Sequence, residues 1–247
     1  MRLRSFTKNL IRRAGYELHP VSRSCLLKDA FADQKVLLAS SPVTTIFDVG
    51  ANSGQTALKY RSLFPDAIIY SFEPCAESFD EMRREFRHDP AIKPVQLAVS
   101  NVCGRKQFFI NRSSFTNSLL PSVDKLGLYE NISTTEVAVT TIDDFCAREA
   151  VNEIHILKMD IQGGELMALE GARKKLSRQE ISLIYTEILF APMYEEQAQF
   201  FKICDFLSGY GYSLFDIYNL AYQASGQLAW GDAIFISPRI KGKGSPA

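Results

Sequence analysis

Apolar residues alternate along the chain between short β-branched runs and longer segments with helical spacing. The runs at 44–49, 67–72 and 154–161 are strand-sized and end at turn residues, which predicts buried parallel strands. Segments 55–64 and 76–87 carry apolar residues at helical spacing. Because strands and helices alternate, we expect βαβ units with right-handed crossovers.

The same patterns continue to the end of the chain and predict a single α/β sheet of about seven strands. They indicate further strands at 95–100, 181–188, 212–218 and 233–237, and helices at 165–176 and 195–207. A loop at 219–231 is expected to join the last two strands.

Residues 101–140 interrupt this rhythm. Short strands are expected at 106–110 and 136–140, around a polar segment, 113–129, that contains Pro121 and Gly127. A long irregular loop in a compact domain is usually functional or disordered, so we expect an insertion beside the mouth of a site. Asn117 and Ser118 are candidates to bind ligand there.

The predicted organisation has three parts: an N-terminal helical extension at 1–40, one domain at 41–240, and a disordered tail at 241–247. The first 15 residues hold five bases and no acid, and their apolar residues are near helical spacing. Two interpretations remain open for this segment. It either packs on the edge of the domain or makes a weak contact with an anionic membrane surface or a phosphorylated substrate.

Charge and cysteine content limit the partners. Lys plus Arg and Asp plus Glu each number 28, so no overall basic field indicates a nucleic-acid partner. The five cysteines are scattered without CxxC spacing, which favours free thiols and a cytoplasmic protein. No apolar run is long enough to span a membrane. The oligomeric state is not predicted.

A glycine-rich turn follows the first predicted strand, as Asp48-Val49-Gly50-Ala51-Asn52-Ser53-Gly54. Gly50 and Gly54 lack a Cβ, so the backbone can turn sharply and a ligand can approach it. The free amides of the following helix favour an anionic group. The spacing is Gly-x-x-x-Gly, which differs from the Gly-x-Gly-x-x-Gly of dinucleotide folds. We therefore name Asp48, Gly50, Asn52, Ser53 and Gly54 as candidate cofactor-binding residues.

An acid follows the second strand, about 20 residues after the glycine turn. Glu73, next to Pro74, can accept hydrogen bonds from both ribose hydroxyls of a bound adenosine. The small residues Ala98 and Ser100 end the third predicted strand and leave room for an adenine ring. Because ligands of open α/β sheets bind outside the carboxyl ends of the strands, these segments predict one cofactor pocket.

A third cluster surrounds the predicted strand at 154–161. Lys158 and Asp160 share one face of this strand, where charges are costly to bury unless paired or functional. Asp160 and Gln162 are expected near the reacting group and the cofactor. Asp160 is the first candidate to orient or deprotonate a hydroxyl, Glu187 the second, and Lys158 the third catalytic candidate or a structural partner.

These motifs together carry a family resemblance. The run DVGANSG, followed by FEP, LKMDIQGGE and YTEI, resembles the FkbM family of methyltransferases over residues 44–237. The resemblance implies a Rossmann-like class I methyltransferase fold, with a seven-stranded, mostly parallel sheet and a reversed last strand. It also implies O-methylation dependent on S-adenosyl-L-methionine, often of a hydroxyl on a sugar, glycolipid or natural product. The family often has Glu where this chain has Gln162.

Other functions stay open at this point. A non-catalytic Rossmann-fold binding module is one alternative, which the acids at 48, 73 and 160 disfavour. A nicotinamide-dependent oxidoreductase is another, disfavoured by the missing Gly-x-Gly-x-x-Gly. A divalent metal at Asp160 is possible, but no ligand spacing indicates one and no metal ligands are predicted.

Overall fold

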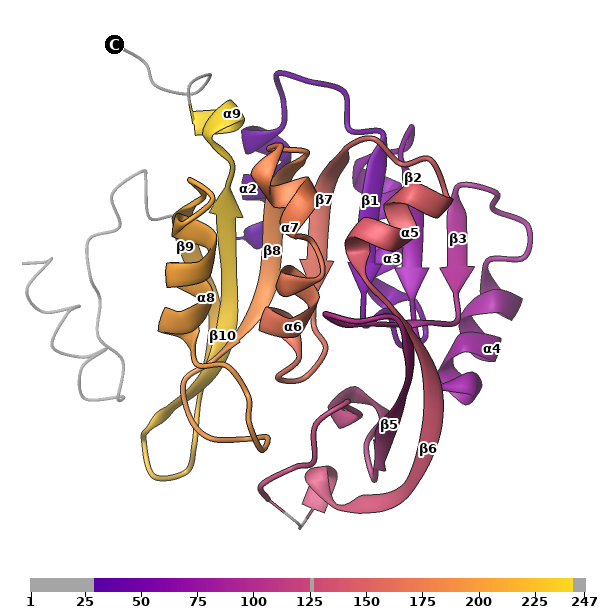
Figure 1. The fold of residues 1–247 in the computed structure, drawn as a ribbon, viewed down its shortest axis with the longest axis vertical. Coiled ribbons are helices and arrows are strands. Elements are labelled where there is room, and N and C mark those ends of the chain that lie inside the picture. Colours follow the sequence, from indigo (N-terminus) through magenta and orange to yellow (C-terminus); the bar gives the residue numbers. More distant parts are fainter. Residues whose placement is uncertain (1–28, 125–126, 242–247) are drawn as a thin grey trace, which may run out of the picture.

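A seven-stranded sheet forms the centre of the protein, seen in a computed structural model that describes residues 29–124 and 127–241 (Figure 1). Its strand order is β3-β2-β1-β7-β8-β10-β9. The strands are β1 (Thr45–Val49), β2 (Ile68–Phe72), β3 (Ile92–Val95), β7 (Ile154–Met159), β8 (Ile181–Leu189), β9 (Ser213–Tyr222) and β10 (Leu228–Ile236). β10 is antiparallel to both of its neighbours, and the other pairs are parallel. The predicted mostly parallel sheet with a reversed last strand is confirmed.

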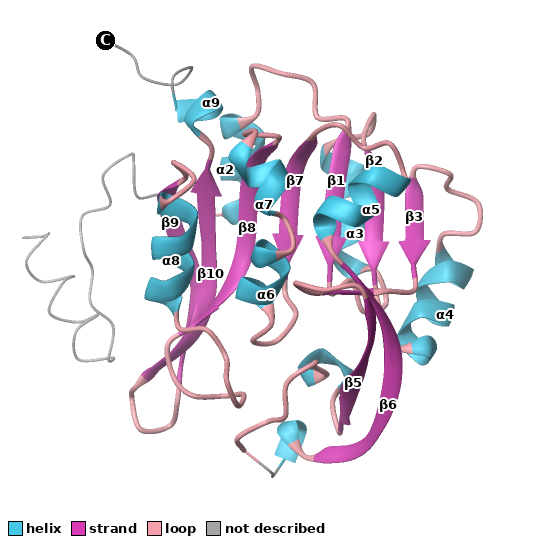
Figure 2. Ribbon diagram, viewed as in Figure 1, coloured by secondary structure: helices cyan, strands magenta, loops and turns pink. Residues whose placement is uncertain are grey.

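Helices cover both faces of this sheet (Figure 2). One face packs against α2 (Ala30–Leu37), α3 (Gln55–Leu63) and α4 (Ala76–Glu85), and the other against α5 (Ile142–Arg148), α6 (Glu165–Glu170), α7 (Arg173–Ser177) and α8 (Phe200–Ser208). A short helix, α9 (Pro238–Lys241), follows β10. Successive side chains of β1 point to opposite faces of the sheet, so Ile46 lies in one core and Phe47 in the other.

Part of the expected N-terminal extension belongs to the folded domain. Ala30 and Leu38 are buried in the core beneath α3. Tyr60 of α3 donates a hydrogen bond of 3.0 Å to the buried Gln34 of α2. The basic segment at 1–15 and residues 242–247 of the expected tail lie outside the described residues, whereas Lys241 ends α9.

The third strand differs from the prediction at 95–100. β3 ends at Val95, and the next two-residue strand, β4 (Ala98–Val99), leaves the main sheet to pair with β6. Pro94 lies inside β3, and proline is disfavoured inside strands because it has no backbone N–H. Proline is tolerated in β3 because this strand lies at the edge of the sheet, where one side of the strand has no neighbour that needs a backbone donor.

Both strands expected in the insertion are present, and both are longer than predicted. The described residues of the polar segment between them, at 113–129, are largely irregular, as expected. β5 (Gly104–Asn111) and β6 (Asn131–Thr140) form a long antiparallel ribbon, and β4 completes a three-stranded sheet. Between them lie two 3₁₀ turns, Ser114–Thr116 and Gly127–Tyr129. Much of the ribbon is exposed on both faces, so its sequence lacks the apolar alternation that marks a half-buried strand.

The prediction of a loop over 219–231 was wrong. β9 and β10 extend into a hairpin that leaves only 223–227 as its turn. Irregular register near Trp230 and Asp232 breaks the period-two pattern that predicts strands. The helix expected at 165–176 is two helices, and α8 begins at Phe200 rather than at 195.

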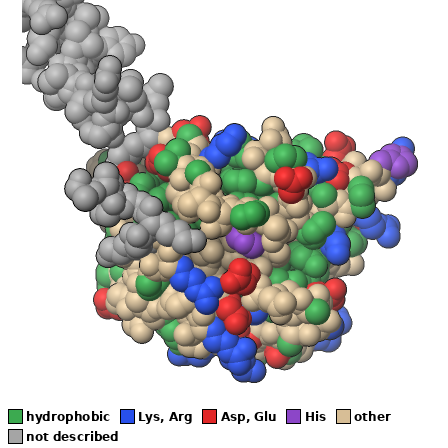
Figure 3. Space-filling view, turned by 90° about the horizontal axis from the view of Figure 1, so that it is seen from above, with side chains coloured by type: hydrophobic (Ala, Val, Ile, Leu, Met, Phe, Trp, Pro, Cys, Tyr) green, Lys and Arg blue, Asp and Glu red, His purple; other side chains and the backbone are tan. Residues whose placement is uncertain are grey.

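The carboxyl ends of the parallel strands and the insertion lie together at the lower end of the molecule (Figure 1). At the opposite end, seen in Figure 3, acidic and basic side chains are interspersed over the described surface. The four described cysteines are free thiols. In the described ranges, no helix is both long and apolar enough to cross a bilayer.

Candidate active site

The glycine turn after β1 brings the backbone of two strand ends into contact. Gly50 has a φ of 77°, and a Cβ at this position would overlap the carbonyl oxygen of Asp160. Gly54 has a φ of 96°, and a Cβ there would overlap the ring of Phe86. Both positions therefore require glycine, and α3 begins directly after the turn with unpaired amides.

Glu73 closes the other side of this turn. Its Oε2 accepts a hydrogen bond from the Asn52 amide at 2.9 Å, and its Oε1 accepts one from the Cys75 amide at 2.8 Å. Burial raises the pKa of Glu73 to about 7, although both amides favour the ionised form. A carboxylate has about four acceptor positions, so it can still receive two ribose hydroxyls.

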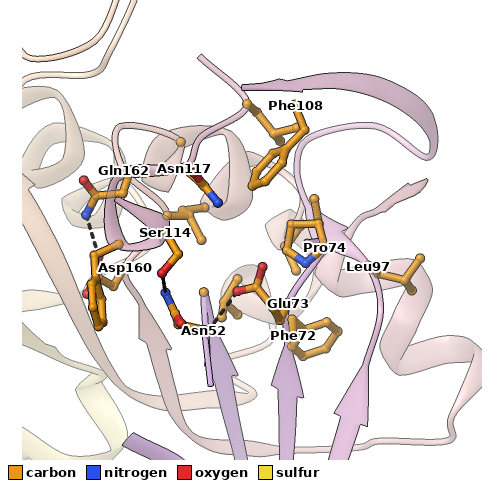
Figure 4. A pocket seen from close by; sticks show the side chains of 18 residues that line it. Asn52, Phe72, Glu73, Pro74, Leu97, Phe108, Ser114, Asn117, Asp160 and Gln162 are labelled. Atoms are coloured by element: carbon orange, nitrogen blue, oxygen red, sulfur yellow. Dashed lines mark hydrogen bonds between the residues drawn. The ribbon is translucent and has the colours of Figure 1, made fainter. Parts of the chain in front are cut away.

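A pocket opens between Glu73 and Asp160 (Figure 4). Of the predicted cofactor residues, its lining includes Gly50, Asn52, Glu73, Pro74, Ala98, Asp160 and Gln162. Apolar side chains that the sequence analysis did not single out complete it: Phe72, Leu97, Val99 and Phe108. A mostly apolar pocket with a few convergent polar groups is typical of a cofactor site.

Four predicted cofactor residues do not line this pocket: Asp48, Ser53, Gly54 and Ser100. Ser53 and Gly54 belong to the turn that shapes it. The buried hydroxyl of Ser100 instead accepts a hydrogen bond of 3.0 Å from the ammonium of Lys106. Ser100 thus contacts β5, the first long strand of the insertion.

Asp48 and Lys158 form a buried ion pair behind the turn. They face each other across β1 and β7, with Lys158 Nζ 3.0 Å from Asp48 Oδ1. The ammonium also donates a hydrogen bond of 3.1 Å to the carbonyl oxygen of Gly50. Burial lowers the pKa of Lys158, but the attraction of Asp48 and Asp160 outweighs it, so the net pKa is raised. Lys158 is therefore placed to position the glycine turn.

The acidic side of the pocket is organised by Gln162. Its Nε2 donates hydrogen bonds to Asp160 Oδ1 at 2.8 Å and to Glu187 Oε2 at 2.9 Å. Its Oε1 accepts one from the Tyr194 hydroxyl at 2.8 Å. Burial and the nearby charge of Asp160 raise the pKa of Glu187 well above its usual range. The amide thus holds together two carboxyl groups that would otherwise repel each other.

Glu165 fixes the turn between β7 and α6. Its buried carboxyl accepts a hydrogen bond of 2.9 Å from the Ile161 amide. Burial raises the pKa of Glu165 to about 7. This contact closes the turn before α6, and it orients the segment that carries Asp160 and Gln162.

The insertion contacts both sides of the pocket. Asn52 donates a hydrogen bond of 3.1 Å to the Ser114 hydroxyl, and the Ser118 hydroxyl donates one of 2.7 Å to the carbonyl oxygen of Gln162. Ser114, Phe115, Asn117 and Leu119 contribute to the lining. The expected position of the insertion, beside the mouth of the site, is the position found.

The strand order, the reversed strand and a pocket at the carboxyl ends define the class of Rossmann-like methyltransferases. The sequence model described as "Methyltransferase FkbM domain" matches residues 48–214. The chain therefore belongs to the FkbM methyltransferase family.

Two named relatives are each 25% identical to this chain in sequence. The 2-O-methyltransferase NoeI of Sinorhizobium fredii is 25% identical over 187 residues, covering 72% of this chain and 76% of the relative. The 31-O-demethyl-FK506 methyltransferase FkbM of Streptomyces tacrolimicus is 25% identical over 174 residues, covering 59% and 67%. A solved rRNA methylase from Streptococcus thermophilus is 8% identical with a TM-score of 0.47, covering 86% of this chain and 98% of that one.

Proposed function

We propose that this protein is an S-adenosyl-L-methionine-dependent O-methyltransferase acting on a hydroxyl of a sugar, glycolipid or other cyclic natural product. One observation carries the proposal: the buried Glu73 carboxylate faces the glycine turn in the same pocket as Asp160. The names of two relatives, a 2-O-methyltransferase and a 31-O-demethyl-FK506 methyltransferase, support transfer to oxygen.

The residues of the pocket fit this cofactor. Glu73 would accept the ribose hydroxyls, and the amides at the start of α3 would receive the methionine carboxylate. The apolar side chains of Leu97, Val99 and Phe108 would enclose the adenine ring. When bound, the cofactor supplies an electrophilic methyl group on a sulfonium.

The protein's own part in catalysis would be alignment and removal of a proton. Asp160 lies in the pocket, where it would orient the acceptor hydroxyl and take its proton, with Glu187 as the second candidate. Gln162 would hold both carboxyl groups in place through its two donors. The insertion would shield the reacting atoms from water.

The test is a transfer assay with S-adenosyl-L-methionine labelled in its methyl group and a panel of sugars and cyclic hydroxy compounds. We expect release of S-adenosylhomocysteine together with a product that carries the label on oxygen. Asp66→Asn, in an exposed turn, serves as the control variant. A label found only on nitrogen or carbon would refute O-methylation, and binding of NAD instead would support an oxidoreductase.

A further inference from the structure

A second cleft, of about 360 Å³, lies beside the pocket at the same end of the sheet. Its lining includes Asp124, Tyr129, Met193, Tyr222, Gln223 and Trp230. This volume is within the usual range for small-molecule sites. Its lining residues differ from those of the pocket between Glu73 and Asp160.

Three separate segments build this cleft, and hydrogen bonds hold them together. The insertion is joined to the loop after β8, because the Val123 amide donates to the Met193 carbonyl at 2.9 Å. That loop is joined to the β9–β10 hairpin, because the Phe190 amide donates to the Ala229 carbonyl at 2.9 Å. The hairpin extends beyond the sheet on the side where the pocket opens (Figure 1).

A short chain of contacts links the cleft to the acidic side of the pocket. The rings of Tyr129 and Tyr194 meet edge to face, with centroids 6.0 Å apart, and the Tyr194 hydroxyl reaches Gln162 at 2.8 Å. Burial, together with the charges of Glu187, Asp124 and Asp160, raises the pKa of Tyr129 to about 12. The cleft is therefore one aromatic layer away from the groups that would meet the reacting hydroxyl.

The composition of the cleft selects an uncharged, ring-shaped ligand. Trp230, Tyr129 and Tyr222 offer flat apolar surfaces, which suit the C–H faces of a saturated ring. Gln223 adds an amide group that can bind hydroxyl groups. In the described part of the lining the charged side chain is an acid, Asp124, so these residues favour an uncharged ligand over an anion.

We propose that this cleft is an outer acceptor subsite. It would hold one uncharged ring of an acceptor with several rings, while a hydroxyl on the neighbouring ring reaches Asp160. The inference rests on the proposed methyltransferase function and adds that the acceptor is larger than a single sugar ring.

The single tryptophan of the chain gives a direct test, because its indole N–H produces one resolved NMR signal. We would titrate the full chain, saturated with S-adenosylhomocysteine, with methyl glucopyranoside, the disaccharide cellobiose and the acyclic polyol sorbitol. We expect a saturable shift of the Trp230 signal with both ring compounds, stronger with cellobiose, and none with sorbitol. No shift with any ring compound, or an equal shift with sorbitol, would overturn the proposal.

Two variants separate this cleft from the rest of the site. Tyr222→Ala, at a side chain that is 62% exposed and safe to truncate, should weaken cellobiose binding at least about fivefold by removal of a stacking surface. Phe201→Ala, an exposed aromatic of α8 outside the cleft, should leave it unchanged. Equal effects of the two variants would contradict the assignment.

Turnover provides the second measurement. With an acceptor from the transfer assay, Trp230→Ala should raise the acceptor KM about tenfold, with affinity for S-adenosyl-L-methionine unchanged. An unchanged acceptor KM would refute the subsite alone. A wild-type chain that fails to bind S-adenosyl-L-methionine would refute the proposed function instead.

Discussion

Gln162 donates a hydrogen bond of 2.9 Å to Glu187, which joins the turn after β7 to the adjoining strand β8. The same amide nitrogen donates to Asp160 at 2.8 Å. A glutamine can satisfy two carboxylates because its NH₂ group has two protons, whereas a glutamate has no donor when it is ionised. In this chain the Gln162 amide therefore bridges the two acids, a role that would otherwise need a shared proton or a bound cation.

Gln162→Glu should consequently make activity depend on pH in a new way. The new glutamate would be a third acid beside Asp160 and Glu187. Glu165 and Asp232 also lie near these acids, and Lys158 is a buried cation close to Asp232. Like charges raise the pKa of carboxyl groups, so the rising limb of kcat against pH should move to higher pH. At neutral pH we expect a loss of at least about tenfold in kcat. The measurement is a pH profile, with the exposed Gln107→Glu as the matched control. Superimposable profiles would contradict this role for the amide.

Asp160→Asn should reduce turnover far more than cofactor affinity. Asparagine keeps the shape of the side chain but cannot take a proton, and a general base typically contributes about 100-fold or more. Steady-state kinetics and calorimetry with S-adenosyl-L-methionine would measure the two effects separately. If kcat with the true acceptor stays near that of the wild type and of Asp66→Asn, Asp160 has a structural role only.

The insertion should become more ordered when ligands bind. Ser114 and Ser118 already contact Asn52 and Gln162 on the two sides of the pocket, so a ligand between them should stabilise the whole segment. Hydrogen exchange with and without S-adenosylhomocysteine and acceptor should show added protection at 114–120. The distant strand β3 should show no change. Protection restricted to 48–54 and Glu73 would exclude a lid.

Much of the fold could be predicted from the sequence, because its strands are buried on both faces and separated by helices with clear periodicity. β1, β2, β7 and β8 were expected within about two residues of their observed bounds. The strands whose bounds were predicted less accurately lack this signal. β3 contains Pro94, β5 and β6 are largely exposed, and the β9–β10 hairpin has irregular register.

The pocket residues that could be predicted are those that directly follow strands of the parallel sheet. Gly50, Glu73 and Asp160 follow consecutive sheet strands, so their meeting at one edge follows from topology. Phe108 and Trp230 come from elements whose path could not be deduced, so the positions of Phe108 in the pocket and Trp230 in the second cleft were not foreseen. The pairing of Lys158 with Asp48 was also not foreseen, because it depends on the register of β1 against β7.

Calorimetric titration of wild type and Glu73→Ala with S-adenosyl-L-methionine tests the central claim most directly. Two charge-assisted hydrogen bonds would be lost, so affinity should fall about tenfold or more, with the exposed Glu77→Ala as the control. Burial raises the pKa of Glu73 to about 7, so wild-type affinity should rise between about pH 6 and pH 8 as the carboxyl ionises. This dependence should disappear in Glu73→Ala. Unchanged affinity in a folded Glu73→Ala variant, or tighter binding of NAD than of S-adenosyl-L-methionine by the wild type, would contradict the account.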